Sequence, residues 1–277
     1  MYKKVVTLYG VPRTGTTWLG QIFDSCPETV YRYQPLFSYR FKNRIKMEDS
    51  KNEITKFLEE LYLESEDSFL SQREQREKGL CPIFENKNPK GDILVYKEAR
   101  YLYTVPLLLE LFEDIKVIGI VRNPVAVLES WMNASSEYKD FWKVEEEWMF
   151  AQSKNEYRPE NYYGYYKWKE CMKMFLDMKN KYPDNFMIVR YEDLYENAVE
   201  KTKELFSFAD VPFAGQTEDF IINSQSRTVD NAYSVYRAKS EKRQRKRILS
   251  EEIKAKIFQD LQEFDEAHLL GYGEGLL

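Results

Sequence analysis

The chain has 277 residues with a formal net charge of −5, 43% hydrophobic residues and 31% charged residues. This composition predicts a globular protein with a substantial core, which excludes intrinsic disorder and argues against wholesale nucleic-acid binding. No run of about 18 apolar residues occurs, so no membrane-spanning segment is expected.

The cysteine and histidine content limits the possible chemistry. The three cysteines, Cys26, Cys81 and Cys171, are widely spaced and match neither a metal-binding pattern nor a disulfide framework. His268 is the only histidine, so we expect neither a histidine-rich metal site nor a histidine-based catalytic triad. The chain opens directly into an apolar strand without a signal peptide, and a reducing, cytoplasmic location is expected.

The stretch from residue 5 to residue 18 reads VVTLYGVPRTGTTW. Residues 5–9 are rich in β-branched side chains, as in a buried strand, and the residues from Trp18 onward have helical spacing. The loop between them, residues 10–17, holds two glycines, three threonines and one arginine. A strand, a glycine-bounded loop and a helix direct backbone N–H groups and a helix N-terminus at an anion. We therefore interpret residues 10–17 as an anion-binding loop, with an ordinary turn as the alternative.

Strands and helices alternate along the rest of the chain. Further strands are predicted at residues 30–33, 93–96, 115–121 and 186–189, of which 115–121 has the nearly continuous apolar composition of a central parallel strand. Helices are predicted within residues 48–80, 102–112, 124–131, 134–182 and 250–265 and after residue 190, with a loop at 84–92 and a basic, polar tail at 225–247. This alternation predicts an α/β fold: a single domain over residues 1–277, with a mostly parallel central sheet flanked by helices and a P-loop-like nucleotide-binding architecture.

The anion-binding loop resembles a Walker A motif in its spacing, because Gly10 and Gly15 are five residues apart. Walker A also needs a lysine directly after the second glycine, to hold the β- and γ-phosphates. Here Thr16 takes that position, and the basic residue of the loop is Arg13. A P-loop nucleotide kinase or NTPase is therefore an alternative that Thr16 argues against.

Arg122 and Ser130 form a second candidate anion site, which follows the strand at 115–121. If Pro124 opens the next helix, Ser130 lies on its second turn and can face the same ligand as Arg122. Arginine offers bidentate contacts to a phosphate, and serine adds a hydroxyl donor. The alternative is a surface arginine that pairs locally. Two anion sites on separate strand ends imply a ligand with separated anionic groups, bound at the carboxyl edge of the sheet.

Several segments are similar to those of sulfotransferases that use 3′-phosphoadenosine 5′-phosphosulfate (PAPS). GVPRTGTTWL resembles their 5′-phosphosulfate loop and VIGIVRNPVAVLESW their 3′-phosphate motif, while VRYEDLYENAVEKTKELFSFADVPF and LLGYG resemble later segments. The resemblance is strongest at the first two motifs and extends from residue 5 to about residue 273. It implies transfer of a sulfuryl group from PAPS, as co-substrate and without a metal, to a hydroxyl or amine of a small-molecule or carbohydrate acceptor.

The resemblance also implies a role for each matching residue. Arg13 would stabilise the charge that builds on the leaving phosphate oxygen. Arg122 and Ser130 would hold the 3′-phosphate. The remaining nucleotide contacts implied by the resemblance are Thr14, Gly15, Thr16 and Thr17 around the 5′-phosphate, Trp18 near the adenine, Tyr191 of the YED motif, and Arg237 and Lys239 in a basic segment that could equally be a solvated face.

Lys97 follows a predicted strand where the family often carries a lysine that reaches the sulfate. A hydroxyl acceptor must lose a proton, for which the family uses histidine or glutamate. Here Ala99 stands in place of the histidine, and Gln34 stands in place of the glutamate of a Glu-Pro pair. Glu98 is then the first candidate for the base, although adjacent strand residues point to opposite faces. Gln34 also motivates another alternative, a non-catalytic nucleotide-binding homologue.

The acceptor side is expected to be formed outside the nucleotide motifs. The tyrosine-rich segment 157–168 and the segment 48–80 are the candidates, because they belong to none of the nucleotide motifs. Stacking aromatic rings would suit a sugar or a phenol equally. The pattern from Lys97 to Arg100 is closer to that of the carbohydrate-type members of the family.

Overall fold

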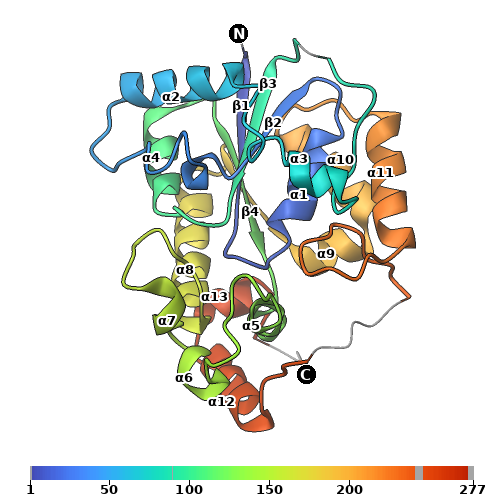
Figure 1. Cartoon of the computed structure of the whole chain (residues 1–277). Helices are drawn as coiled ribbons and strands as arrows, with labels where there is room; N and C mark the ends of the chain where they lie inside the picture. The colour runs from blue at the N-terminus through green and yellow to red at the C-terminus, as the bar shows by residue number, and fades with distance from the viewer. Residues whose placement is uncertain (1, 89, 241–245, 274–277) are drawn as a thin grey trace.

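One parallel sheet of five strands, in the order β2-β3-β1-β4-β5, organises the described residues (Figure 1). This computed structural model describes residues 2–88, 90–240 and 246–273. The predicted α/β fold with a central parallel sheet is confirmed, and all five predicted strands form. Their bounds are Lys4–Tyr9 (β1), Thr29–Tyr33 (β2), Ile93–Glu98 (β3), Lys116–Val121 (β4) and Phe186–Arg190 (β5).

Helices cover both faces of the sheet, so each face buries its own apolar cluster. One face is covered by α1 (Thr16–Asp24), α9 (Tyr191–Glu196), α10 (Ala198–Phe208) and α11 (Gly215–Ser226). The other is covered by α2 (Lys51–Leu63), α4 (Thr104–Leu111), α5 (Pro124–Met132), α8 (Tyr165–Lys181) and α12 (Glu251–Gln262). Shorter elements are η1 (Pro35–Phe37), α3 (Arg73–Glu77), α6 (Val144–Glu147), α7 (Gln152–Asn155) and α13 (Asp265–Leu269).

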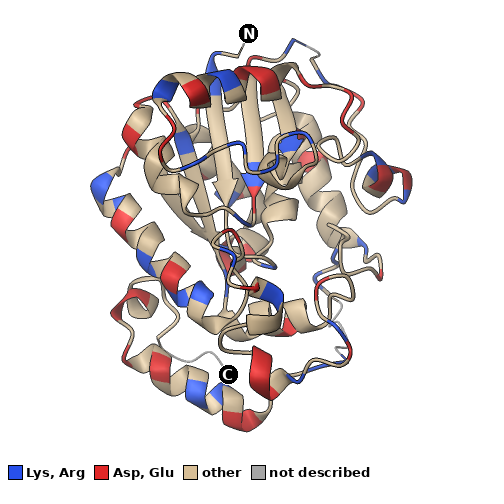
Figure 2. Ribbon diagram, turned by 60° about the vertical axis from the view of Figure 1, so that its left-hand side comes forward, with Lys and Arg blue, Asp and Glu red and all other residues tan. Residues whose placement is uncertain are grey.

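Charged residues are distributed along these helices, with basic and acidic residues interspersed (Figure 2). Many form pairs three or four residues apart on one helix, such as Lys201 with Glu204 and Lys256 with Glu252. No helix within the described ranges is both long enough and apolar enough to cross a membrane.

The carboxyl ends of β1 and β4 mark the point where the chain changes direction across the sheet. From β3, on one side of β1, the chain passes through α4 and enters β4 on the other side of β1. In a parallel sheet, the connections that leave two such strands diverge and open a crevice above their ends. The anion-binding loop leaves β1 and Arg122 follows β4, so both candidate anion sites lie at this crevice.

The prediction of helix throughout 134–182 was wrong in its first half. Only the short α6 and α7 form before α8 begins at Tyr165. The buried side chain of Asn155 holds the intervening loop, because its Nδ2 donates to the carbonyls of Phe150 (2.8 Å) and Tyr163 (2.9 Å) and its Oδ1 accepts from the Tyr163 N–H (3.1 Å). A side-chain amide that satisfies backbone groups in this way competes with helix formation.

The segment 48–80 also contains less helix than its periodicity predicts. A capping box between Ser50 and Glu53 starts α2, which ends at Leu63. The Glu64 carboxylate then accepts the backbone N–H groups of Glu66 (2.8 Å) and Asp67 (3.0 Å), which turns the chain away from the helix axis. The helix therefore stops where a side chain offers the backbone a local partner.

Candidate functional site

The anion-binding loop, residues 10–17, takes a conformation that only a few residue types tolerate. Arg13 has φ 75° and Gly15 has φ 98°, both in the left-handed region. At Gly15 a Cβ atom would lie 2.6 Å from Cδ2 of Tyr191, so α9 packs directly against the loop. The N-terminus of α1 follows at Thr16. Its first-turn N–H groups have no partners within the helix, and the helix dipole is positive there, so this end of the loop favours an anion.

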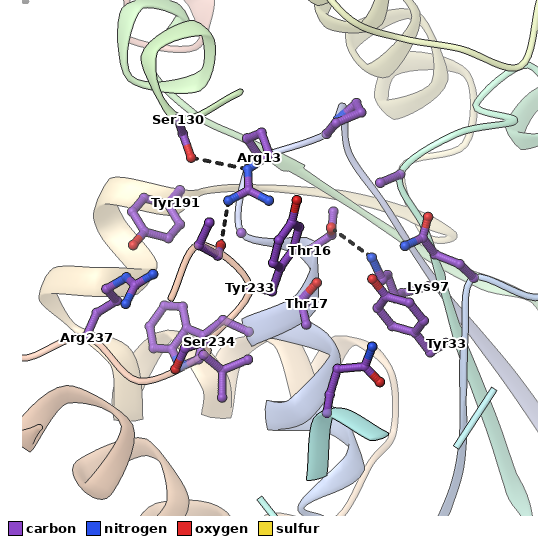
Figure 3. A pocket seen from close by; sticks show the side chains of 18 of the residues that line it. Arg13, Thr16, Thr17, Tyr33, Lys97, Ser130, Tyr191, Tyr233, Ser234 and Arg237 are labelled. Atoms are coloured by element: carbon purple, nitrogen blue, oxygen red, sulfur yellow. Dashed lines mark hydrogen bonds between the residues drawn. The ribbon is translucent and has the colours of Figure 1, made fainter. Parts of the chain in front are cut away.

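A cavity of about 470 Å³ opens beside this loop (Figure 3). Its described lining comes from the loop, the carboxyl ends of β2 and β3, α5 and the turn after it, α9, and residues 224–238, which we call the closing segment. The predicted site residues that line it are Arg13, Gly15, Thr16, Thr17, Trp18, Lys97, Arg122, Ser130, Tyr191 and Arg237. The structure thus brings most of the predicted set into one cavity.

The two candidate anion sites meet at Arg13. Its Nε donates to Oγ of Ser130 (3.2 Å), and its backbone carbonyl accepts from Nη1 of Arg122 (3.1 Å). Nη2 of Arg13 donates to the carbonyl of Ala232 in the closing segment (2.6 Å), and the guanidinium lies 5.4 Å from the centre of the Tyr233 ring. Figure 3 shows the guanidinium between Ser130 and the Tyr233 ring. Arg13 is therefore fixed between the β4 side of the cavity and its outer wall.

Lys97 enters the cavity from β3. Its Nζ donates to Oγ1 of Thr16 (3.4 Å) and lies 4.3 Å from the centre of the Tyr33 ring, which is paired with Lys97 in the register of β2 and β3. The side chain is almost completely buried, with 1% exposure. Burial lowers the pKa of Lys97 to about 7, because removal from water disfavours the charged form. This lysine gains its full charge readily when an anion binds beside it.

Glu98 is not brought to the cavity. Its side chain lies on the other face of β3, where Oε1 accepts the backbone N–H of Leu36 (2.7 Å), and it is absent from the described lining. The alternation of side chains along a strand explains this, because Lys97 faces α1 and its neighbour must face the opposite side. Complete burial raises the pKa of Glu98 to about 8. The structure therefore does not support the expected role of Glu98 as the base.

We expect Glu98→Gln to leave turnover within about twofold of wild type, since a residue outside the cavity does not touch the acceptor. Between about pH 4.5 and about pH 8 the folded chain keeps a proton that the unfolded chain loses, so Glu98 lowers stability as pH rises. Glutamine does not titrate, so the variant avoids this fall, and its free energy of unfolding at about pH 8 is expected to exceed that of wild type by roughly 1–3 kcal/mol. Thermal unfolding of both proteins at acid and alkaline pH, together with activity, checks this. A folded but inactive variant would contradict it.

Two further predicted residues, Thr14 and Lys239, do not line the cavity, whereas Arg237 does. Thr14 is fully buried beneath the loop and its Oγ1 donates to the carbonyl of Val11 (2.8 Å), so it braces the loop rather than lining the cavity. Lys239 lies outside the described lining, and its Nζ donates to the carbonyl of Glu196 (2.8 Å). Arg237 does line the cavity, and it also donates to carbonyls of the closing segment. Part of the basic segment, residues 241–245, lies outside the described residues.

The two aromatic residues of the predicted set form one wall. Trp18 donates its Nε1 to Oγ of Ser224 (2.9 Å) and meets Tyr191 edge-on, with ring centres 6.1 Å apart. Tyr191 stacks on Tyr195 at 5.7 Å, and the guanidinium of Arg122 lies 4.1 Å from its ring centre. Flat rings beside a guanidinium form a surface on which a base can stack.

Sequence reasoning missed several lining residues. Glu137, in the turn after α5, and Tyr233, in the closing segment, belong to no recognised motif. Arg100 lies 4.0 Å from the centre of the Phe37 ring and donates to the hydroxyl of Tyr163 (3.3 Å). Tyr163 comes from the tyrosine-rich segment 157–168, and Phe69 comes from the segment 48–80, so both segments that were expected on the acceptor side reach the cavity. The position of these two segments outside the nucleotide motifs was the signal available for Tyr163 and Phe69.

The charges in the cavity are strongly unequal. Among the described lining residues five carry a positive group, namely Arg13, Lys97, Arg100, Arg122 and Arg237, and one, Glu137, carries a carboxylate. Over the described ranges, no group of three or more His, Cys, Asp or Glu residues is placed to hold a metal ion. Such an excess of cations favours a ligand with several negative charges.

The model of the sulfotransferase family matches residues 6–215. The chain belongs to the sulfotransferase family. This sulfotransferase-family chain is 29% identical to human carbohydrate sulfotransferase 3 over 134 residues, which cover 46% of the chain and 27% of that relative. The mouse protein of the same name is 28% identical over 134 residues, covering 46% of the chain and 28% of that relative. The chain thus spans only about a quarter of the length of these curated relatives.

Solved structures show the same fold. A mouse sulfotransferase complexed with PAP superposes with a TM-score of 0.56 at 13% identity, over 99% of this sulfotransferase-family chain and 91% of that chain. A sulfotransferase from Alicyclobacillus acidocaldarius superposes with a TM-score of 0.54 at 14% identity, over 100% of this chain and 98% of that chain. At this identity the similarity concerns the fold, which is the P-loop-like sheet that the sequence predicted.

Proposed function

We propose that this chain transfers a sulfuryl group from PAPS to a hydroxyl or amine of a carbohydrate or small-molecule acceptor. The observation that carries the proposal is the contact between two anion sites within one cavity, with Arg13 bonded to Ser130 and to Arg122. A nucleotide that carries phosphate at both its 3′ and 5′ positions has anionic groups for both sites. Membership of the sulfotransferase family supports the same substrate.

The loop and α1 would bind the 5′-phosphosulfate. Gly15, Thr16 and Thr17 would offer backbone and hydroxyl donors at the positive end of the α1 dipole. Arg122 and Ser130 would hold the 3′-phosphate, and Trp18 and Tyr191 would contact the adenine. Arg237 would close over the nucleotide from the closing segment, whereas Lys239 would act only through its contact with α9.

Arg13 and Lys97 would act on the reacting groups. As the bond to sulfur breaks, negative charge builds on the phosphate oxygen that leaves, and a fixed cation stabilises that charge more in the transition state than in the ground state. Arg13 is held in place by Ser130 and Ala232 before any ligand arrives. Lys97 would contact the sulfuryl oxygens from the β3 side, opposite Arg13 across the cavity (Figure 3).

The acceptor would enter on the side of Tyr33, Phe37 and Tyr163, where aromatic rings and Arg100 line the cavity. Aromatic faces suit sugar rings, and the matched relatives are carbohydrate sulfotransferases, so a carbohydrate acceptor is the first choice. The cytoplasmic location expected from the sequence stays a prediction.

Calorimetric titration with 3′,5′-adenosine bisphosphate (PAP), the product nucleotide, tests this proposal directly. We expect binding with a dissociation constant of about 1 μM, equivalent to about −8 kcal/mol. AMP, which lacks the 3′-phosphate, serves as the matched ligand and is expected to bind at least about tenfold more weakly. Equal binding of both nucleotides, or none of PAP, would contradict a two-phosphate site.

The same titration reports on Lys97. At about pH 8 the free protein holds this lysine mostly neutral, since its pKa is about 7. A bound anion favours the charged form, so PAP binding is expected to take up as much as about one proton. The measured heat then differs between phosphate and Tris buffers, whose ionisation enthalpies differ. Lys97→Met is expected to remove the difference, and its absence in wild type would show that Lys97 does not sense the nucleotide.

Two alternatives are separated by activity measurements. A P-loop kinase or NTPase would turn over ATP with Mg²⁺, although Thr16 stands in place of its phosphate-binding lysine. A non-catalytic homologue would bind PAP but transfer no sulfate to any acceptor. Transfer from PAPS to a panel of sugars and phenols distinguishes both alternatives from the proposed function.

A further inference from the structure

Glu137 is the one carboxylate among the described residues that line the cavity. It lies in the turn that follows α5, and its backbone is anchored at both polar groups. Its N–H donates to the carbonyl of Ala134 (2.8 Å), and its carbonyl accepts from Nε1 of the buried Trp131 (3.3 Å). The side chain is 21% exposed, so it projects from a fixed backbone into a sheltered part of the cavity.

The two oxygens of this carboxylate are in different situations. Oε1 lies 3.9 Å from Nη1 of Arg13. Oε2 is buried and has no hydrogen-bond partner. A buried carboxylate oxygen without a partner is costly, by about 1–3 kcal/mol or more, and is explained when the site awaits a ligand that donates to it. Oε2 is therefore an unused proton acceptor on the same carboxylate whose Oε1 lies 3.9 Å from the guanidinium assigned to the sulfuryl group.

Other candidates for accepting the acceptor's proton do not reach this place. Glu98 faces Leu36 on the far side of β3. Gln34 lines the cavity, but an amide cannot take up a proton at neutral pH. His268 lies in α13 with its Nε2 at 3.0 Å from the carbonyl of Gln262, and it is not part of the described lining.

We propose that Glu137 is the general base of the reaction, with Oε2 accepting the proton of the acceptor hydroxyl. This inference rests on the proposed function. The acceptor oxygen forms a bond to sulfur while the bond between sulfur and the 5′-phosphate oxygen breaks, and the electron pair of that bond leaves with the phosphate. The acceptor's proton passes to Oε2, which later releases it to solvent, so a sulfate ester and PAP are formed.

The charged surroundings keep Glu137 suited to this role. Positive groups face it from the anion-binding loop, from β3 and from α7, while two tyrosines face it from β2 and from the segment before α8. These groups are Arg13, Lys97, Lys154, Tyr33 and Tyr163. The negative charge of Glu137 raises the pKa of the two tyrosines, although burial contributes more in both cases. Glu137 thus lies among groups of opposite charge on one side and aromatic hydroxyl groups on the other.

Glu137→Gln tests the inference, and the test needs no knowledge of the acceptor. Water is the smallest hydroxyl acceptor, so release of labelled sulfate from PAPS measures the same transfer. We expect the rate of release to fall by about 100-fold, the usual contribution of a general base, while PAP affinity stays within about threefold. The decline of the wild-type rate at acid pH, which follows protonation of the base, is expected to disappear in the variant.

Glu146→Gln is the matched control, because it makes the same chemical change at an exposed residue of α6 that is paired with Lys143. It is expected to behave as wild type. Glu137→Asp keeps the carboxylate but shortens the side chain by one methylene. Its rate of sulfate release is expected to be about tenfold lower than that of wild type and still to decline at acid pH. This second variant also answers the question if the glutamine variant does not fold.

The outcomes separate this inference from the proposed function. A wild-type protein that does not bind PAP refutes the proposed function itself. Normal PAP binding with unchanged sulfate release in Glu137→Gln overturns the inference alone, and Glu137 is then only a counter-ion of Arg13. A wild-type protein that binds PAP but releases no sulfate above the uncatalysed rate also overturns it.

Discussion

Replacing Arg13 with alanine is expected to lower the turnover number by about 10²–10³-fold, the effect of removing one fixed donor from a charge that develops in the transition state. The affinity for PAP should fall much less, because the product nucleotide no longer carries the sulfuryl group. The measurement is the rate of sulfuryl transfer from PAPS under saturating nucleotide, compared with PAP binding. A variant with near-normal turnover would remove Arg13 from the mechanism.

The fold is expected to survive this substitution. Arg13 has φ 75°, and alanine occupies this region with a strain similar to that of arginine. The lost side-chain contacts are the hydrogen bonds to Ser130 and Ala232 and the weaker contacts with Glu137 and the Tyr233 ring, so the melting temperature should shift by no more than about 4 °C. Arg158→Ala, at an exposed arginine paired with Glu156, is the matched control and should change neither property. Arg13→Lys keeps the positive charge but lacks the planar guanidinium with its paired N–H donors, and it should retain part of the activity.

Replacing Arg122 with alanine is expected to weaken PAP binding by about 100-fold, or about 2.7 kcal/mol, because one guanidinium makes charge-assisted hydrogen bonds to a phosphate and also supports the loop. Its Nη1 holds the carbonyl of Arg13 at 3.1 Å, and its charge lies over the Tyr191 ring. Titration with PAP measures the loss. AMP lacks the 3′-phosphate, so its weaker binding should change far less in the variant.

Lys239→Ala is the control for this prediction, since both residues are basic and the resemblance implied that both contact the nucleotide. Lys239 donates to the carbonyl of Glu196 and lies outside the described lining of the cavity. We expect its removal to change PAP affinity by less than about threefold. Equal losses in the two variants would show that general positive charge, and not a defined phosphate site, attracts the nucleotide.

Local patterns predicted well which residues gather around the anion-binding loop. The apolar runs that end at Tyr9 and Val121 are strands because near-continuous β-branched and aliphatic residues suit a sheet buried on both faces. Parallel strands bring their carboxyl ends to one edge, so Arg13 and Arg122 had to lie near each other. The positions of the glycines and of the strand ends can be recognised from a few neighbouring residues, so this part of the site could be predicted.

The acceptor side depends on contacts that no short window contains. Glu137 lies in an irregular turn after α5, and its importance arises only when folding places it beside Arg13 and leaves Oε2 without a partner. Glu98 lies outside the cavity for a local reason, because the two-residue period of β3 sends Lys97 and Glu98 to opposite faces. The false helix within 134–182 has a third cause, the buried side chain of Asn155, whose hydrogen bonds to the backbone outweigh helical propensity.

The part of the chain that forms the cavity is longer than the region that the family model matches. The family match ends at residue 215, yet residues 224–238 form the outer wall of the cavity. A protein trimmed to the matched region would keep the anion-binding loop and the segment from Arg122 to Ser130, but Trp18 would lose Ser224 and Arg13 would lose Ala232. The cavity would then lack its outer wall. Exchange of residues 224–238 between relatives is therefore a route to altering the outer wall while the strands and the anion-binding loop stay as they are.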